Sequence, residues 1–180
     1  MSDIPTWRRV ALAAIALAVS GWLLRGQIAD GLVVRGDEML YRGAVSAALT
    51  YYRRAMLLDP GDGAAVDRFA FFAMNTHDGA KLRESVAIAS RYLQDHPGDD
   101  VVRMDRAMAY RSLADNRDAL PDFARIGKRA GDARALTFAG YCALALGQRH
   151  RAVGLLRDAV ALAPSLPAAR DALMRLELRR

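Results

Sequence analysis

Cysteine and histidine are scarce in this chain of 180 residues. Cys142 is the single cysteine, which excludes an internal disulfide, and its apolar surroundings favour a buried structural thiol over a reactive one. None of the three histidines has a second ligand at zinc-binding spacing. The sequence also lacks a glycine-rich phosphate loop and a nucleophile elbow. We therefore expect no enzymatic activity, no metal site and no cofactor.

Lysine is almost absent as well, because every basic residue except Lys81 and Lys128 is an arginine. The net charge is +6, but the arginines are scattered and are not interleaved with aromatic residues, so we expect no nucleic-acid partner. Hydrophobic residues make up 53% of the chain, and much of that share is alanine. This composition favours close-packed helices over a sheet.

The longest apolar run covers residues 10–24 and reads VALAAIALAVSGWLL. It is shorter than the roughly 20 residues of a typical spanning helix, but its flanks can complete a crossing by snorkelling and interfacial anchoring. The flanking residues are Trp7, Arg8, Arg9, Trp22 and Arg25. We predict a single-pass anchor over residues 1–27. The basic flank places the N-terminus in the cytoplasm and residues 28–180 in the periplasm, at a bacterial inner membrane.

Two other interpretations of this run remain open. Ala18, Val19 and Ser20 form a small-residue cleavage site before Gly21, as in a secretory signal peptide. The run could also be a buried core helix, although the absence of a polar face disfavours that interpretation.

Four stretches of the chain repeat one spacing of small residues, with steps of 12, 4, 3 and 5 residues. Two series end at proline: Gly36, Ala48, Tyr52, Ala55 and Pro60, and Gly140, Ala152, Leu156, Ala159 and Pro164. A third ends at glycine: Ala107, Ala119, Phe123, Ile126 and Gly131. In the fourth the first step grows to 15: Ala70, Ser85, Ala89, Tyr92 and Pro97. This period is typical of stacked helix–turn–helix units that cannot bury their apolar faces alone.

The spacing has direct physical reasons. Small residues let antiparallel helices approach closely, so we expect Gly36 to face Ala48 and Gly140 to face Ala152. The bulkier members are expected to fill the gap toward the next unit: Tyr52, Phe123 and Leu156. Each proline lacks a backbone donor and should end a helix. Carboxylates at the turns are expected to cap helix starts: Asp62, Asp99, Asp100 and Asp132.

The pattern resembles the tetratricopeptide repeat (TPR) family, which has small residues in both helices of a unit and a closing proline. The resemblance implies an all-α solenoid of about four units with a terminal cap, and the apolar run predicts a hydrophobic helix before it. The units cover residues 29–60, 63–97, 100–131 and 133–164, and the cap covers residues 165–180. In the third unit, Arg103 and Arg106 stand where the family usually has bulky apolar residues.

The resemblance also implies a concave groove that is lined by the first helix of each unit. Carried over by register, its partner-binding positions are mostly apolar, aromatic or methionine: Val33, Leu40, Tyr41, Phe71, Met74, Met104, Met108, Arg111, Tyr141 and Leu144. Asp67 occupies another groove position. We predict that the groove receives an apolar helix or extended segment, either of a partner or of this chain itself. The alternative is that the register is off by one and these residues only pack between helices.

These features predict a non-catalytic protein–protein interaction scaffold that is tethered to the membrane. It would assist the assembly or maturation of an envelope or periplasmic protein complex, with membrane lipid around the N-terminal helix. Two alternatives follow from the other interpretations of that helix. One is a structural integral subunit whose helix packs through Ala14, Ala18 and Gly21. The other is a secreted periplasmic binding protein, released by signal cleavage.

Overall fold

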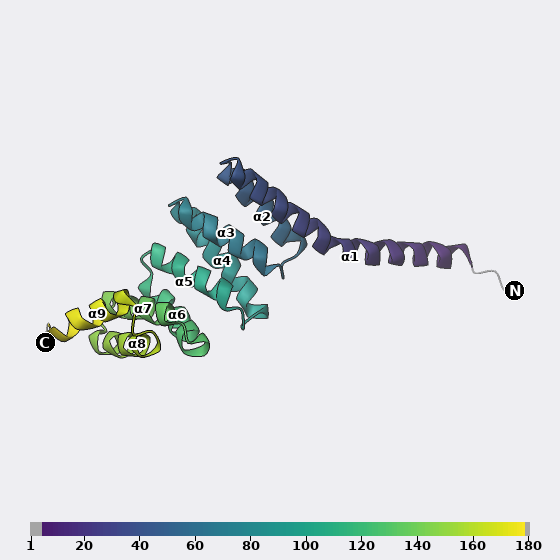
Figure 1. Cartoon of the computed structure of the whole chain (residues 1–180). Coiled ribbons are helices and arrows are strands. Elements are labelled where there is room, and N and C mark those ends of the chain that lie inside the picture. The colour runs from purple at the N-terminus through teal and green to yellow at the C-terminus, as the bar shows by residue number, and fades with distance from the viewer. Residues whose placement is uncertain (1–4, 179–180) are drawn as a thin grey trace. The chain divides into compact units, whose positions relative to one another are not determined.

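The computed structural model describes residues 5–178, and every regular element in that range is an α-helix (Figure 1). The helices are α1 (Thr6–Tyr41), α2 (Val45–Leu58), α3 (Gly63–Asn75), α4 (Gly79–Asp95), α5 (Asp100–Ser112), α6 (Asn116–Ala130), α7 (Ala133–Ala145), α8 (Arg149–Leu162) and α9 (Pro167–Leu178). The first four residues of the predicted anchor and the last two of the predicted cap lie outside the described range. The chain divides into two compact units, Met1–Ala65 and Val66–Arg180.

In the first unit, α1 is a single helix of 36 residues, about 54 Å long at 1.5 Å per residue. Its second part packs on α2, where Ala29 lies in a small core with Ala55 and Ala65. Its first part extends beyond the end of α2 (Figure 1). The predicted domain boundary after residue 27 falls inside this helix and stays a prediction.

Close helix packing occurs at Gly36 and Gly140, as the spacing predicts, but the partner side chains differ from those expected. A Cβ atom on Gly36 would lie 2.5 Å from Cε1 of Tyr52. One on Gly140 would lie 2.8 Å from Cγ of Leu156 and 3.6 Å from the carbonyl oxygen of Ala152. Tyr52 and Leu156 therefore lie over the glycines of their own hairpins. The missing Cβ atoms leave room there for these large side chains. Phe123 does reach the next predicted unit, since its ring centroid lies 5.3 Å from that of Phe138. For Tyr52 and Leu156 the expectation that they fill the gap toward the next unit stays a prediction.

In the second unit, neighbouring helices pack in chain order from α4 to α9, and α9 also contacts α7. The core is rich in alanine and includes Ala107, Leu120, Phe123, Leu136 and Cys142. Cys142 is fully buried, as the sequence predicts, and burial raises the pKa of its thiol. α6 continues through Pro121 as one helix. The cap helix α9 buries Ala169 and Ala172.

The helix ends agree with the turn chemistry that the sequence predicts. α2, α4 and α8 end at Leu58, Asp95 and Leu162, each two residues before a proline. Gly131 closes α6 in the left-handed conformation, with φ of 66°, which favours glycine. Carboxylates accept backbone N–H groups at three of the four predicted caps: Asp62, Asp99 and Asp132. Asp100 is instead the first residue of α5 and pairs with Arg129.

Candidate functional site

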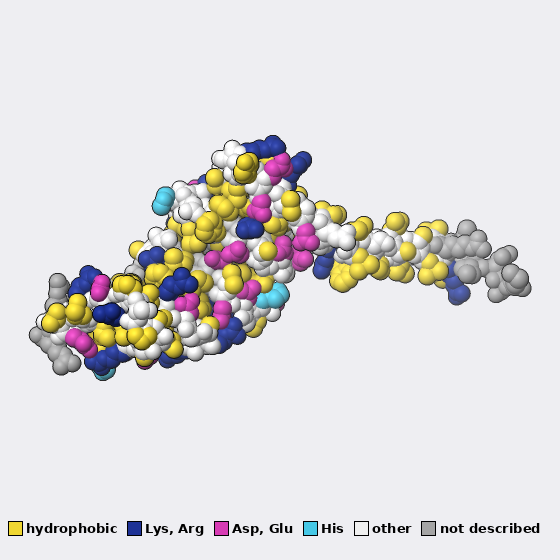
Figure 2. Space-filling model, in the orientation of Figure 1, with side chains coloured by type: hydrophobic (Ala, Val, Ile, Leu, Met, Phe, Trp, Pro, Cys, Tyr) yellow, Lys and Arg dark blue, Asp and Glu magenta, His cyan; other side chains and the backbone are white. Residues whose placement is uncertain are grey.

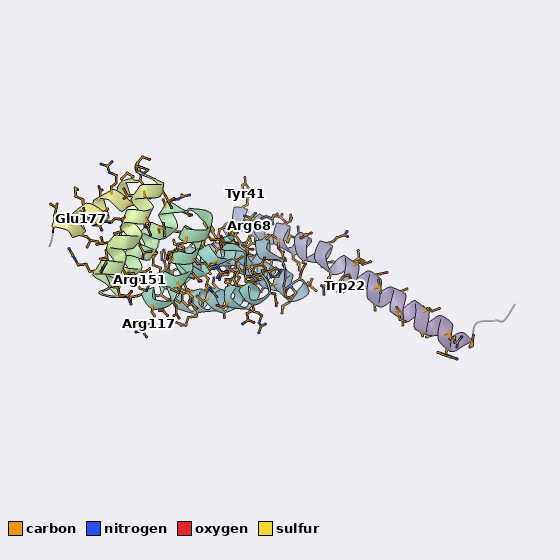
Figure 3. The ribbon with its side chains drawn as sticks, turned by 90° about the horizontal axis from the view of Figure 1, so that it is seen from below. Trp22, Tyr41, Arg68, Arg117, Arg151 and Glu177 are labelled. Atoms are coloured by element: carbon orange, nitrogen blue, oxygen red, sulfur yellow. The ribbon has the colours of Figure 1, made fainter. Side chains whose placement is uncertain are left out.

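The first part of α1 exposes its apolar side chains along the whole run of residues 10–24. Figure 2 shows this part as mostly yellow and white, with dark-blue side chains near its two ends. The Arg8 guanidinium carbon lies 5.2 Å from the ring centroid of Trp7, and that of Arg25 lies 4.9 Å from Trp22. Trp22 projects from the side of the helix (Figure 3). Aromatic rings with cationic neighbours suit the headgroup level of a bilayer.

By length and composition, the described residues contain one helix that could cross a membrane, over Val10–Tyr41. Its most apolar window has a mean hydropathy of 1.5, and none of that window is buried. The alternative of a buried core helix does not hold, because the described structure covers none of this surface. An exposed apolar surface of this extent indicates contact with a membrane or another protein.

The ten predicted groove residues fall in both units, and three of them lie on α1. Val33 is half-buried and packs against the small core of Ala29, Ala55 and Ala65. Leu40 is half-buried. Tyr41 is almost fully exposed at the end of α1, where its side chain extends into solvent (Figure 3).

In the second unit, three predicted groove residues present an aromatic or cationic group at the surface. Phe71 on α3 is 53% exposed, and its ring meets that of Phe72 edge to face at 5.0 Å. Tyr141 on α7 donates its hydroxyl to the carbonyl oxygen of Ala168 at 3.0 Å. The guanidinium carbon of Arg111 lies 5.0 Å from the ring centroid of Phe138.

Three of the four remaining groove residues lie at the edge of the core of the second unit. Met104, Met108 and Leu144 are half-buried and pack against the core cluster, and Met74 on α3 is also half-buried. Such residues contribute to the core while keeping part of their surface accessible. The groove assignment therefore stays a prediction.

A buried ionic network occupies the positions where Arg103 and Arg106 replace apolar residues. Arg106 donates Nε to Oδ2 of Asp122 and Nη2 to Oδ1, both at 2.8 Å. Arg103 donates Nη1 to Oδ1 of Asp122 at 3.5 Å and Nη2 to the Pro97 carbonyl oxygen at 2.5 Å. Asp122 and Arg103 are both buried. The hydrogen bonds to Asp122 raise the pKa of Arg106, so its guanidinium group stays charged.

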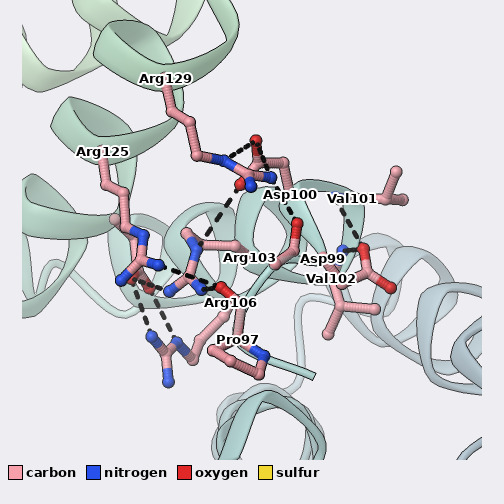
Figure 4. A network of polar contacts seen from close by, with 11 residues as sticks. Pro97, Asp99, Asp100, Val101, Val102, Arg103, Arg106, Arg125 and Arg129 are labelled. Carbon is pink, nitrogen blue, oxygen red and sulfur yellow. Dashed lines mark hydrogen bonds and ion pairs between the residues drawn. The ribbon is translucent and has the colours of Figure 1, made fainter.

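Two further arginines of α6 bind the turn that precedes α5 (Figure 4). Arg125 donates Nη2 to the Pro97 carbonyl oxygen at 3.1 Å. Arg129 donates Nε to Asp100 at 3.0 Å and Nη2 to the carbonyl oxygen of Gly98. The network ties α6 to the turn that joins the second and third predicted repeats. The sequence interpretation missed Asp122, although its place three residues after Ala119 and four before Ile126, both buried, indicates a buried carboxylate.

A second polar group missed by the sequence interpretation lies between α3 and α5. Asp105 is only 9% exposed, and its Oδ2 is buried with no hydrogen-bond donor. Burial, and then the charge and hydrogen bonding of Asp67, raise the pKa of Asp105 to about 8. The sequence spacing does indicate that Asp105 is buried, because it is three residues after buried Val102 and four before buried Ala109.

Comparison with solved structures places this arrangement among known folds. A tetratricopeptide repeat protein from Parabacteroides merdae ATCC 43184 matches with a TM-score of 0.71 at 19% identity, over 84% of this chain and 60% of the other. The chain thus spans 60% of the length of that protein. MamA from Desulfovibrio magneticus RS-1, from residue 41 to its end, matches with a TM-score of 0.71 at 18% identity, over 84% of each chain.

The Cut9–Hcn1 hetero-tetramer of the APC/C also contains a similar chain, with a TM-score of 0.61 at 17% identity over 81% of this chain and 29% of the other. No family model matches the chain, and no curated protein matches it in sequence. The similarity is therefore one of backbone architecture. The chain has a tetratricopeptide-repeat-like fold, an all-α solenoid with a long apolar helix at its N-terminal end.

Proposed function

We propose that this protein is a non-catalytic, protein-binding scaffold that is tethered to a membrane. The observation that carries the proposal is the combination of a TPR-like fold with an exposed apolar stretch in α1. Repeats of this kind offer extended surfaces for protein partners. The described residues contain no cluster of three His, Cys, Asp or Glu side chains that could hold a metal ion.

The continuity of α1 supports a short tether. No helix break separates the apolar stretch from Gly36, where α1 packs on α2. The first hairpin would then stay near the membrane surface, where anchoring raises the effective concentration of membrane-bound partners. The basic flank at Arg8 favours a cytoplasmic N-terminus and a periplasmic repeat domain at a bacterial inner membrane.

The partner is proposed to be a protein of an envelope complex whose assembly or maturation the scaffold assists. One structural neighbour occurs in a hetero-tetramer, Cut9 with Hcn1, which supports a protein ligand for this fold. The apolar character of Phe71 and Met74 on α3 favours an apolar helix or extended segment as the part that binds.

Carbonate extraction and intact-mass measurement of the protein from native membranes test the tether. We expect the protein to resist extraction and to retain residues 1–20. Release by carbonate with a new start near Gly21 would show a cleaved signal peptide, and the tether would be rejected.

Site-specific photo-crosslinking in native membranes tests the partner surface. A photoreactive residue at Phe71 should yield a discrete crosslinked species, and Phe71→Asp should prevent partner retention in mild detergent. Leu162 on α8 is a matched control, because it is 52% exposed against 53% for Phe71. Equal loss of the partner with Leu162→Asp, or no effect of Phe71→Asp, would contradict the proposed groove.

A further inference from the structure

We infer that the outer face of α9 is a self-association surface, on which α9 of a second copy of this chain packs in antiparallel orientation across a two-fold axis. The outer face consists of four exposed residues at helical spacing: Arg170, Met174, Glu177 and Leu178. Two other residues of the same helix, Ala169 and Ala172, are buried in the second unit. None of the ten predicted groove residues belongs to the outer face, so the inference is independent of the groove.

The first observation is that the outer face exposes large apolar side chains. Met174 is 55% exposed and Leu178 is 78% exposed, one helical turn apart. Both line a hollow of about 290 Å³ together with half-buried Leu173 of α9 and Val160 of α8. Exposed apolar side chains that gather around a hollow indicate a contact surface for another protein.

The second observation is a pair of opposite charges on either side of Met174. Arg170 lies one turn before Met174, and Glu177 lies about one turn after it, in the last turn of α9 (Figure 3). The guanidinium group of Arg170 has no hydrogen-bond or ion-pair partner among residues 5–178. Glu177 accepts from Arg157 of α8 through Oε1 at 2.9 Å, which leaves Oε2 available to a second cation.

This order of residues makes the outer face complementary to itself. When two copies of α9 lie antiparallel, with Leu173 of each beside Met174 of the other, Arg170 of each lies opposite Glu177 of the other. The two-fold axis then forms the same ion pair twice. A parallel pair in the same register would instead place like charges opposite each other, which is unfavourable. The charges therefore favour the antiparallel arrangement.

The apolar and the charged residues contribute differently to this contact. Burial of Met174 and Leu178 removes apolar surface from water and supplies most of the affinity. Exposed ion pairs add little affinity, but they select the orientation because wrong orientations bring like charges together. One helix pair buries less surface than a standard interface, so we expect a weak, reversible dimer.

Contacts with α8 hold the last turns of α9 in place before any second copy binds. Arg149 donates to the carbonyl oxygen of Leu176, and Arg157 pairs with Glu177. A preformed surface loses little conformational freedom on association. The outer face can therefore dimerise without a rearrangement of the second unit.

Sedimentation equilibrium of the full chain in density-matched detergent micelles tests the surface. We expect a reversible monomer–dimer equilibrium at protein concentrations of about 100 μM. Met174→Asp should raise the dimer dissociation constant by about ten-fold or more, because it buries a charge at the contact. Leu162→Asp on α8 should leave it unchanged, since Leu162 is 52% exposed but lies outside the outer face. Circular dichroism verifies that both variants are folded.

Charge reversal tests the antiparallel arrangement. Arg170→Glu and Glu177→Arg should each weaken self-association, because like charges then meet twice across the two-fold axis. An equimolar mixture of the two variants should form a dimer again, because every reversed charge then meets its opposite.

Three results would overturn the inference. They are a monomeric native protein at about 100 μM, a dimer that Met174→Asp leaves unchanged, and a mixture of the two charge variants that sediments as monomers. The second result would assign self-association to another part of the chain. Crosslinking at Phe71 decides separately whether the scaffold function stands.

Discussion

Arg106 and Asp122 form a bidentate ion pair across α5 and α6, through two hydrogen bonds of 2.8 Å each. Asp122 also accepts from Arg103, which is buried at a position that is usually apolar in similar repeats. One carboxylate thus accepts from two guanidinium groups in a poorly solvated site, while Nε of Arg103 is left without a hydrogen-bond acceptor. In the third predicted unit this ionic contact joins α5 and α6 beside the apolar contacts of Ala107, Leu120 and Phe123.

Removal of the Asp122 carboxylate, which Arg103 and Arg106 share, should lower the stability of the fold. Asp122→Ala leaves Arg103 and Arg106 buried without their common partner, and we expect the free energy of unfolding to fall by about 3–5 kcal/mol. Urea denaturation followed by circular dichroism measures the change. The matched control is Glu177→Ala, which breaks the exposed pair with Arg157 and should cost less than about 1 kcal/mol. Similar losses in the two variants would mean that water screens the Asp122 network.

Two helical glycines should respond in opposite ways to alanine. A Cβ on Gly127 in α6 would lie 2.4 Å from Cγ of Leu136 and 3.1 Å from its backbone nitrogen, so Gly127→Ala should destabilise the fold by about 1–3 kcal/mol. A Cβ on Gly154 in α8 would meet no atom within 4 Å. Gly154→Ala should therefore stabilise by about 0.5–1 kcal/mol through helix propensity. Thermal melting of the two variants tests the contrast, and a stabilising Gly127→Ala would refute the close α6–α7 packing.

Asp105 makes stability depend on pH. Burial and Asp67 raise its pKa from 3.8 to about 8 in the folded state. Its contribution is therefore fully present below pH 3.8, declines as pH rises, and is lost above about 8. Asp105→Asn should remove this dependence, so the variant gains stability relative to the native protein between about pH 5 and pH 9. Urea midpoints at the two pH values measure the difference, with Asp158→Asn as control. A parallel response of native protein and Asp105→Asn would argue against the raised pKa.

A charge in the apolar stretch should release the protein from the membrane. Leu17→Arg places an arginine near the centre of residues 10–24, at an insertion cost of about 2.5–3.5 kcal/mol. Leu57→Arg on α2 is the control, since both leucines are exposed on helices. Membrane fractionation should show loss of the first variant from the pellet and retention of the second. Retention of both would indicate that another contact holds the protein there.

Sequence spacing predicted much of the fold because its signals are local. A proline lacks a backbone donor wherever it stands, and a carboxylate before a helix can reach the first free N–H groups. Pro60, Pro97, Asp99 and Asp132 therefore marked helix ends without reference to any distant residue of the chain. The apolar run of residues 10–24 was equally evident, because length and hydropathy are properties of consecutive residues.

The polar interior depended on distant pairing and could not be deduced in this way. Asp122 meets Arg106 from 16 residues away, and Asp67 meets Asp105 from the neighbouring first helix. The packing of the helices decides which carboxylate pairs with an arginine and which lies beside another carboxylate. The sequence by itself determined the helical repeats, their ends and the apolar stretch. Only the tertiary structure decided where charge is neutralised and where it is not, because desolvation and ion pairing exist only once the helices are in contact.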